Sequence, residues 1–342
     1  MLGGLVYPAI AVPLVLLPVY YHRVSTSNKA RVDAVRAENA MVSLSGKTAV
    51  IVGGTSGIGR GLAVRLAKAG ASVTIVGRSP TRGAEVVNEM NQVAGTSSSS
   101  GSHSFLACNC FSLAKVNECV STLKDKHESI DYLVCSQGMA TIQGWTATSE
   151  EEQLDQKLTL HVYSRAAFAR GLGEVLQRSG DGKFMSVLSA GVHSAYADYA
   201  TDPELNRGAY SIKNAADAAG FYNDIMVDSY SQRFQGTTFL HVAPGFVATN
   251  WGTEMPQLIR WLVRGMQALA GRTLEDNGEY MMRALTHPSH SVHSEDGRRF
   301  YLVDQYGVAT AKVTALHDTA MQSVFKSIEA VLDAGRSAVP KL

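Results

Sequence analysis

Seven short apolar runs alternate with helical patterns along most of this chain, and this alternation constrains the fold more than any other feature. The runs lack the strict apolar–polar alternation of a half-exposed strand, so each is expected to be a strand covered on both faces. Repeated strands and helices predict an α/β fold, a Rossmann-type doubly wound parallel sheet of about seven strands with right-handed crossovers. The expected strands are residues 48–52, 72–76, 104–108, 132–136, 184–189, 237–243 and 299–303.

Composition narrows the class further. The 342 residues are 45% hydrophobic and carry a net charge of +1, which leaves no basic field for nucleic acid. Four cysteines in a chain of this length do not indicate a disulfide framework. Cys108 and Cys110 form a Cys-x-Cys pair without a nearby second pair, so no metal site is expected. Small strand-lining residues in a reducing compartment are the simpler interpretation.

The first 21 residues are apolar and carry no charged side chain. About 20 apolar residues suffice for one bilayer crossing, so residues 1–21 are expected to form a membrane-anchor helix. Prolines at positions 8, 13 and 18 would kink it; a segment embedded in one leaflet and a buried core helix are the alternatives. Basic residues follow in a connector over 22–44, which places the domain over 45–342 on the cytosolic side of an endoplasmic-reticulum-like membrane.

A glycine-rich segment directly follows the first expected strand and opens the first expected helix. Its glycines are spaced Gly-x-x-x-Gly-x-Gly, which allows a tight turn and close approach of the backbone to a pyrophosphate. The helix N-terminus then supplies N–H groups and a favourable dipole. The strand–turn–helix context makes this a strong dinucleotide signal. The residues expected at the cofactor are Gly53, Thr55, Ser56, Gly57, Ile58 and Gly59.

This spacing resembles the short-chain dehydrogenase/reductase family over roughly Leu44 to the C-terminus. "LACNCFSLAKV" is similar to the family's adenine contact, with Asn109 in place of an aspartate. "DYLVCSQG" is similar to another family motif and keeps its glycine, Gly138. "APGFVATN" matches the family's Pro-Gly-x-Val-x-Thr, so the resemblance implies that Pro244, Gly245 and Thr249 line the nicotinamide end.

The end of the second expected strand indicates which cofactor is bound. The sequence "TIVGRS" offers Arg78 and no carboxylate. A carboxylate here would bind the ribose 2′-hydroxyl of NAD, whereas an arginine accommodates the 2′-phosphate of NADP. NADP(H) is therefore the expected cofactor, unless Arg78 is merely a solvated loop residue.

The resemblance also implies the reacting groups. In the family a tyrosine is the acid/base, a serine hydrogen-bonds the same substrate oxygen, and a lysine four residues after the tyrosine holds the ribose and lowers the tyrosine pKa. Ser189 matches the serine, and Tyr210 in "GAYSIKNAAD" matches the tyrosine. His161 falls where the family has an asparagine that orders a water; it could relay a proton or be an ordinary half-buried histidine.

The lysine of "GAYSIKNAAD" is displaced by one position. Lys213 is three residues after Tyr210, and Asn214 holds the fourth place. On a helix these two side chains diverge by about 100°, so two registers remain open. Either Asn214 faces the ribose, or Lys213 keeps the ribose and electrostatic role while Tyr210 reaches the substrate from a shifted position.

These motifs favour an NADP(H)-dependent oxidoreductase that acts on a ketone, aldehyde or alcohol. The long insert between Ser189 and Tyr210 is similar to retinol-dehydrogenase-type members, which implies a lipophilic substrate such as a retinoid, sterol, terpenoid or polyketide. The alternative is a non-catalytic NADP-binding or scaffold protein with a degenerate site. A sugar-nucleotide epimerase would need more chain after Thr249. The apolar stripes of the last helices could form a homodimer.

Overall fold

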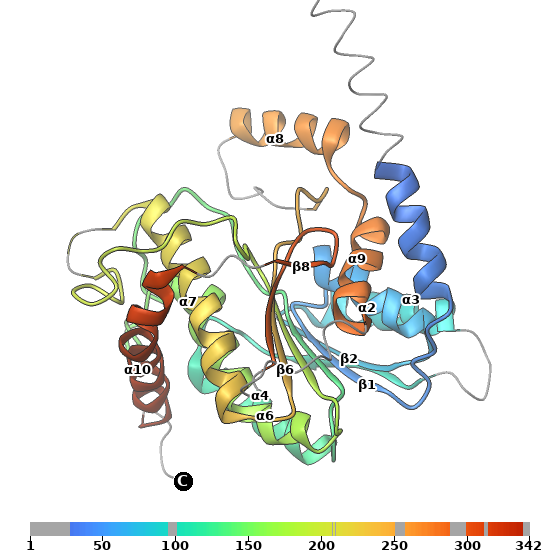
Figure 1. Ribbon diagram of the computed structural model, residues 1–342, viewed down its shortest axis with the longest axis horizontal. Coiled ribbons are helices and arrows are strands. Elements are labelled where there is room, and N and C mark those ends of the chain that lie inside the picture. The colour runs from blue at the N-terminus through green and yellow to red at the C-terminus, as the bar shows by residue number, and fades with distance from the viewer. Residues whose placement is uncertain are drawn as a thin grey trace, which may run out of the picture. The chain divides into compact units, whose positions relative to one another are not determined.

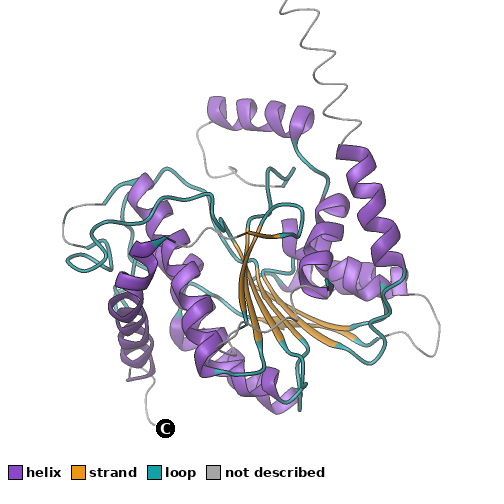
Figure 2. Cartoon of the chain, viewed as in Figure 1, coloured by secondary structure: helices purple, strands orange, loops and turns teal. Residues whose placement is uncertain are grey.

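An eight-stranded sheet carries the predicted alternation, with strand order β3-β2-β1-β4-β5-β6-β7-β8 (Figures 1 and 2). The first seven strands are parallel, and β8 pairs antiparallel with β7. The Rossmann-type prediction is therefore confirmed, with one short strand added. The strands are β1 (Thr48–Val52), β2 (Ser72–Gly77), β3 (His103–Ala107), β4 (Tyr132–Cys135), β5 (Lys183–Val187), β6 (Thr238–Val242), β7 (Phe300–Val303) and β8 (Ala309–Thr310).

The computed structural model describes residues 28–94, 101–206, 208, 210–249, 257–287, 299–310 and 314–337. The chain divides into two compact units, Met1–Val42 and Ser43–Leu342. The first contains a described helix over residues 28–40, and the second holds the whole sheet. The membrane helix expected over residues 1–21 lies outside the described residues. Among the helices that are described, none combines the length and the apolar character needed to cross a bilayer.

Helices cover both faces of the sheet, as the continuous apolar runs require (Figure 1). The helices α2, α3 and α9 pack together on one face, and α4, α6 and α7 cover the other, where α10 packs on α7 and α4. Their bounds are α2 (Gly57–Lys68), α3 (Pro80–Ala94), α4 (Leu113–Lys126), α5 (Gln156–Leu158), the π-turn η1 (Thr159–Tyr163), α6 (Ser164–Gln177), α7 (Ile212–Arg233), α8 (Gln257–Ala270), α9 (Leu274–Thr286) and α10 (Ala315–Ser337).

The central strands form the core. Every residue of β4, β5 and β6 is buried, whereas β3, at the edge of the sheet, is only half-buried. The strand order reverses between β1 and β4, since the chain runs outward on one side of this pair and returns to continue on the other. In doubly wound sheets ligands bind at the carboxyl ends of the strands beside such a reversal.

One strand boundary and one helix boundary differ from the sequence prediction in a way that affects the site. The strand β5 ends at Val187, so Ser189 lies beyond it in a turn that a Val192 N–H to Ser189 carbonyl bond closes at 2.9 Å. The helix α7 begins at Ile212 with Ser211 as its N-cap, so Tyr210 precedes the helix.

Candidate active site

A cleft of about 870 Å³ opens at the carboxyl ends of the parallel strands, beside the strand-order reversal. The glycine-rich loop after β1 forms one wall, and the segments after β4, β5 and β6 form the others. Most residues predicted to contact the cofactor line this one cleft: Gly53, Thr55, Ser56, Gly57, Ile58, Arg78, Gly138, Pro244, Gly245 and Thr249.

The loop is shaped by glycines that other residues could not replace. Gly53 has a φ of +81°, and a Cβ there would lie 2.5 Å from the Gln137 backbone nitrogen. Gly59 is buried below the cleft, where a Cβ would lie 2.3 Å from the Ser136 hydroxyl and 2.5 Å from the Gly53 carbonyl oxygen. Gly59 therefore allows helix α2 to pack closely against the strand ends, instead of touching a ligand.

The N-terminus of α2 points its first N–H groups at this loop. Its N-cap, Ser56, makes no side-chain capping bond, and the first turn contains no acidic residue. Uncapped N–H groups and the helix dipole make such an end a binding site for an anion. Together with the tight glycines, this arrangement fits the pyrophosphate of a dinucleotide.

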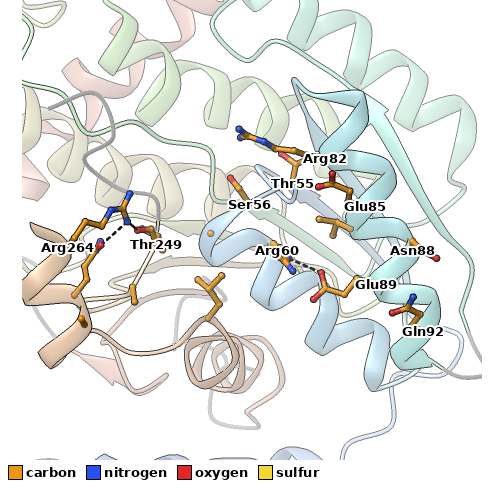
Figure 3. Close-up of a pocket in the computed structure, with 16 residues that line it drawn as sticks. Thr55, Ser56, Arg60, Arg82, Glu85, Asn88, Glu89, Gln92, Thr249 and Arg264 are labelled. Atoms are coloured by element: carbon orange, nitrogen blue, oxygen red, sulfur yellow. Dashed lines mark hydrogen bonds and ion pairs between the residues drawn. The ribbon is translucent and has the colours of Figure 1, made fainter. Parts of the chain in front are cut away.

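Arg78 and Arg82 lie near the end of β2, and two further arginines line an adjoining hollow. Arg78 lines the cleft, and its guanidinium lies 5.1 Å from the centre of the Phe111 ring. Arg82 on α3 lines both this cleft and an adjoining hollow of about 880 Å³, shown in Figure 3. In that hollow Arg60 is paired with Glu89 at 2.7 Å. Arg264 donates to the Thr249 carbonyl (Figure 3).

Tyr210 meets a lysine that comes from a different part of the chain. Lys157 on the short helix α5 donates from its Nζ to the Tyr210 hydroxyl at 2.7 Å, and also to the Gln143 carbonyl. Burial, and then the nearby Asp155 carboxylate, raise the pKa of Tyr210, so its hydroxyl stays protonated at neutral pH. Burial lowers the pKa of Lys157.

The predicted role of Lys213 differs from what the structure shows. Its ammonium pairs with Asp217 one turn along α7, and its side chain is 74% exposed. Both registers considered above assumed that Tyr210 lies on the helix, but the helix begins two residues later. Asn214 lies in the first turn of α7, where its backbone N–H is bonded to the capping Ser211 hydroxyl at 2.9 Å.

Similarity to known proteins agrees with this geometry. A family model described as short chain dehydrogenase matches residues 47–202. The "Putative daunorubicin C-13 ketoreductase DnrU" of Streptomyces sp. (strain C5) is 30% identical over 212 residues, 61% of this chain and 69% of that protein. The chain belongs to the short-chain dehydrogenase family.

Other relatives of this short-chain dehydrogenase are more distant. "Oxidoreductase AN1596" of Emericella nidulans is 27% identical over 219 residues, and the match spans 63% of each protein. The alcohol dehydrogenase of the archaeon Thermococcus sibiricus, solved in complex with 5-hydroxy-NADP, has a TM-score of 0.55 and 16% identity. That match covers 78% of this chain and 98% of the solved one, and it shows the shared fold.

Two other predicted residues of the short-chain dehydrogenase site have structural partners. His161 lines the cleft, and its Nε2 accepts the Met139 N–H at 3.1 Å. Burial first, then Arg165 and Lys157, lower the pKa of His161 to about 3, so the ring is neutral. Asn109 is exposed beside the cleft, and its side-chain oxygen accepts the Phe111 N–H at 3.3 Å.

Arg165 and Lys157 are the site residues that sequence reasoning missed. Arg165 is 1% exposed and lines the cleft, where it donates to the Gln137 and Val187 carbonyls at 2.6 and 2.9 Å. Burial lowers the pKa of Arg165 to about 10, which still leaves it charged. An arginine next to the apolar run from Ala166 to Ala169 was the available signal for Arg165. Lys157 carried none, because no motif spacing relates it to Tyr210.

Proposed function

We propose that the protein is an NADP(H)-dependent oxidoreductase that interconverts a carbonyl and an alcohol group on a small lipophilic molecule. One observation carries this proposal: a single cleft joins the anion-binding end of α2 and Arg78 to the segments after β5 and β6. Its volume of about 870 Å³ and its mixed polar and apolar lining support a dinucleotide as the ligand.

Arg78 and Arg82 support NADP(H) in preference to NAD(H). Both line the cleft near the end of β2, and the segment Gly77–Ser79 offers no carboxylate for a ribose hydroxyl. A guanidinium is the group best suited to hold a phosphate through paired hydrogen bonds. Thus we expect the 2′-phosphate of NADP to lie between these two arginines.

Apolar side chains support a lipophilic substrate. Met139, Leu188, Phe246 and Val247, from the segments after β4, β5 and β6, line the cleft, and Phe246 is 41% exposed. A relative named as a ketoreductase fits a substrate of this kind. Within that class a retinoid, sterol, terpenoid or polyketide of the retinol-dehydrogenase type fits the proposal.

The chain's own residues can supply the proton. Bound NADPH would supply the hydride to the carbonyl carbon. Lys157 donates to the oxygen of Tyr210, and the Asp155 carboxylate accepts from the same hydroxyl. The Tyr210 proton would leave Asp155 for the carbonyl oxygen as negative charge develops there. Ser189 would donate its hydroxyl to the same oxygen. The ammonium of Lys157 then stabilises the phenolate that remains.

The rival is an NADP-binding protein without turnover, and the exposure of Lys213 favours it. The discriminating experiment follows NADPH oxidation with a panel of lipophilic ketones, comparing the wild type, Tyr210→Phe and the control Tyr199→Phe. We expect Tyr210→Phe to lose about 10² to 10⁴-fold in kcat with NADPH binding unchanged, and the control to keep its activity. Activity that survives Tyr210→Phe contradicts the mechanism; NADPH binding without turnover on any ketone favours the rival.

We also propose membrane association. The apolar segment over residues 1–21 supports it. So does α8, which exposes Leu258, Trp261 and Leu262 beside the exposed Arg260, a composition typical of helices that lie at a lipid surface. Replacing Leu14 and Leu17 with arginine should release the full-length protein from membranes on fractionation, and retention of the double variant contradicts the anchor.

A further inference from the structure

A buried carboxylate is surrounded by three imidazoles, and two of these imidazoles contact the backbone of Ser189. Asp224 on α7 is 3% exposed, and His193, His241 and His317 all contact it. His193 Nε2 and His317 Nε2 lie 3.2 and 3.1 Å from Asp224 Oδ2, while His241 Nδ1 is bonded to Oδ1. These side chains come from the turn after β5, from β6, from α7 and from α10, so the cluster joins four elements.

The partners of two imidazoles fix their protonation. His241 Nε2 accepts the backbone N–H of Ser189 at 3.1 Å, so its Nδ1 carries the hydrogen that is donated to Asp224. His317 Nδ1 accepts the backbone N–H of Thr314 at 3.1 Å, so its hydrogen is on Nε2, facing Asp224. Both rings are therefore neutral, single-hydrogen tautomers.

The third imidazole has an acceptor at each nitrogen. His193 Nδ1 lies 2.9 Å from the Ser189 carbonyl, which can only accept, and Nε2 faces the Asp224 carboxylate. Both nitrogens thus carry hydrogen, and His193 is a cation. Burial opposes this charge, but Asp224, the Ser189 carbonyl and Asp217 outweigh burial and raise the pKa of His193. The other facing groups are neutral His241 and His317 and the more distant Arg165.

The same tautomers argue against a metal ion. Ligand atoms of His193, Asp224 and His317 lie within 4.8 Å of one another, as they would around a cation. A ligating imidazole nitrogen must carry no hydrogen, yet the Thr314 N–H requires the hydrogen of His317 to be on the nitrogen that faces Asp224. The cluster is a hydrogen-bond network with one positive and one negative charge.

Packing against α7 holds the imidazole of His193 in place. A Cβ at Gly220 would lie 2.3 Å from the ring of His193, so only glycine leaves room for it. Ser189 is consequently held at both backbone groups: its N–H by His241 and its carbonyl by His193. Its hydroxyl lies 3.5 Å from His193 Nδ1, so it is not strongly held by that ring.

We propose that protonated His193, backed by Asp224, is a positioning residue that fixes the Ser189 turn for the reaction and loosens it when the imidazole loses its proton. The role for Ser189 rests on the proposed reductase function. Because the folded pKa of His193 is raised, this hold is fully present below the ordinary histidine pKa and is lost as pH rises through the raised value.

The network is tested first without turnover. Nitrogen NMR of the full-length protein with isotopically labelled histidine should show His193 with both nitrogens protonated at about pH 6. His241 should carry hydrogen on Nδ1 only, and His317 on Nε2 only. A neutral His193 at that pH, or one zinc ion bound per chain after incubation with zinc, overturns the proposal. This readout fails or succeeds independently of the proposed reductase activity.

The positioning role is tested by two variants that divide the contacts of His193. His193→Asn keeps a donor near the Ser189 carbonyl, and His193→Gln reaches toward Asp224 instead. We expect kcat to fall about tenfold or more in His193→Gln, to recover in part in His193→Asn, and the KM for NADPH to stay constant. The wild-type pH–rate profile should contain a fall in kcat with the same midpoint as the His193 NMR titration, distinct from the decline that follows Lys157, and His193→Asn should lack that fall while keeping the Lys157 decline. His287→Asn is the matched control; a fall that persists unchanged in His193→Asn refutes the positioning role.

Discussion

At the scale of single residues, the proposed reacting centre includes a lysine that the tyrosine motif does not contain. Lys157 contacts Tyr210, whereas the sequence predicted that Lys213 or Asn214 would do so. The distance from Lys157 to Tyr210 along the chain is 53 residues, so only the fold brings them together. Sequence reasoning could identify the tyrosine from its motif, but a cation delivered by another element leaves no local pattern.

The alkaline limit of catalysis should follow from Lys157. Burial lowers the pKa of its ammonium below the ordinary value of about 10.4, while Tyr210 stays protonated because its own pKa is raised. Carbonyl reduction should therefore decline as pH rises through the lysine pKa. Lys157→Arg keeps the charge to higher pH and should shift this decline upward in a pH–rate profile. An identical profile for the arginine variant would show that another group titrates.

Cofactor preference should depend on Arg78. Replacing it with glutamate removes one donor for a 2′-phosphate and puts a carboxylate where a ribose hydroxyl could bind. We expect Kd for NADPH to rise about tenfold or more, equivalent to about 1.4 kcal/mol, while NADH binding improves. Cofactor fluorescence titration measures both. Arg60→Gln is the control, because Arg60 is already paired with Glu89; equal loss in both variants contradicts a specific phosphate contact.

At the scale of elements, helix α2 is the best-predicted part of the site. Its glycines and its start after β1 follow from the local sequence, whereas the missing side-chain cap at Ser56 is seen only in the structure. The start of α7 was harder to predict, because the family resemblance put Tyr210 on the helix and the capping role of Ser211 was not recognised. A shift of two residues there removed the helical geometry on which the lysine prediction depended.

Gly59 gives a test of the packing between α2 and the strand ends. A valine would place its Cβ within 2.5 Å of the Gly53 carbonyl and against Ser136, so the helix must move away. We expect Gly59→Val to destabilise the fold by about 1 to 3 kcal/mol, the usual cost of overpacking, and to weaken NADPH binding. Urea unfolding and cofactor titration measure these effects. Gly265→Val on α8, where a Cβ meets nothing within 4 Å, is the control.

At the scale of the molecule, the doubly wound sheet followed from the alternation of apolar runs alone. Burial of every residue in β4, β5 and β6 is the physical basis of that pattern. The two-residue β8 was not predicted, because so short a segment has no periodicity to detect. The histidine cluster was also missed: its four residues span positions 193 to 317 and meet only through tertiary packing.

Acid stability should reflect that cluster, because Asp224 joins four elements. Burial alone would raise the pKa of Asp224, but His241, His193 and His317 hold it well below its usual range. Its stabilising contribution is therefore present above about pH 4 and is lost as pH falls below that value. Asp224→Asn should cost about 3 to 5 kcal/mol at neutral pH by leaving a buried cation unpaired, and the gap from wild type should narrow in acid. Denaturant unfolding across pH measures it; a gap independent of pH contradicts the assignment.

Because Tyr210 precedes α7, the position of the proposed acid can change independently of cofactor binding. A tyrosine on the helix itself would link the two. The cofactor cleft is built from strand ends and a helix N-terminus, whereas the proposed acid is carried by the end of a long connecting segment. Changes in length or sequence of that segment can move the acid relative to the substrate while leaving dinucleotide affinity intact. Substrate range could therefore diverge among close relatives through this segment alone.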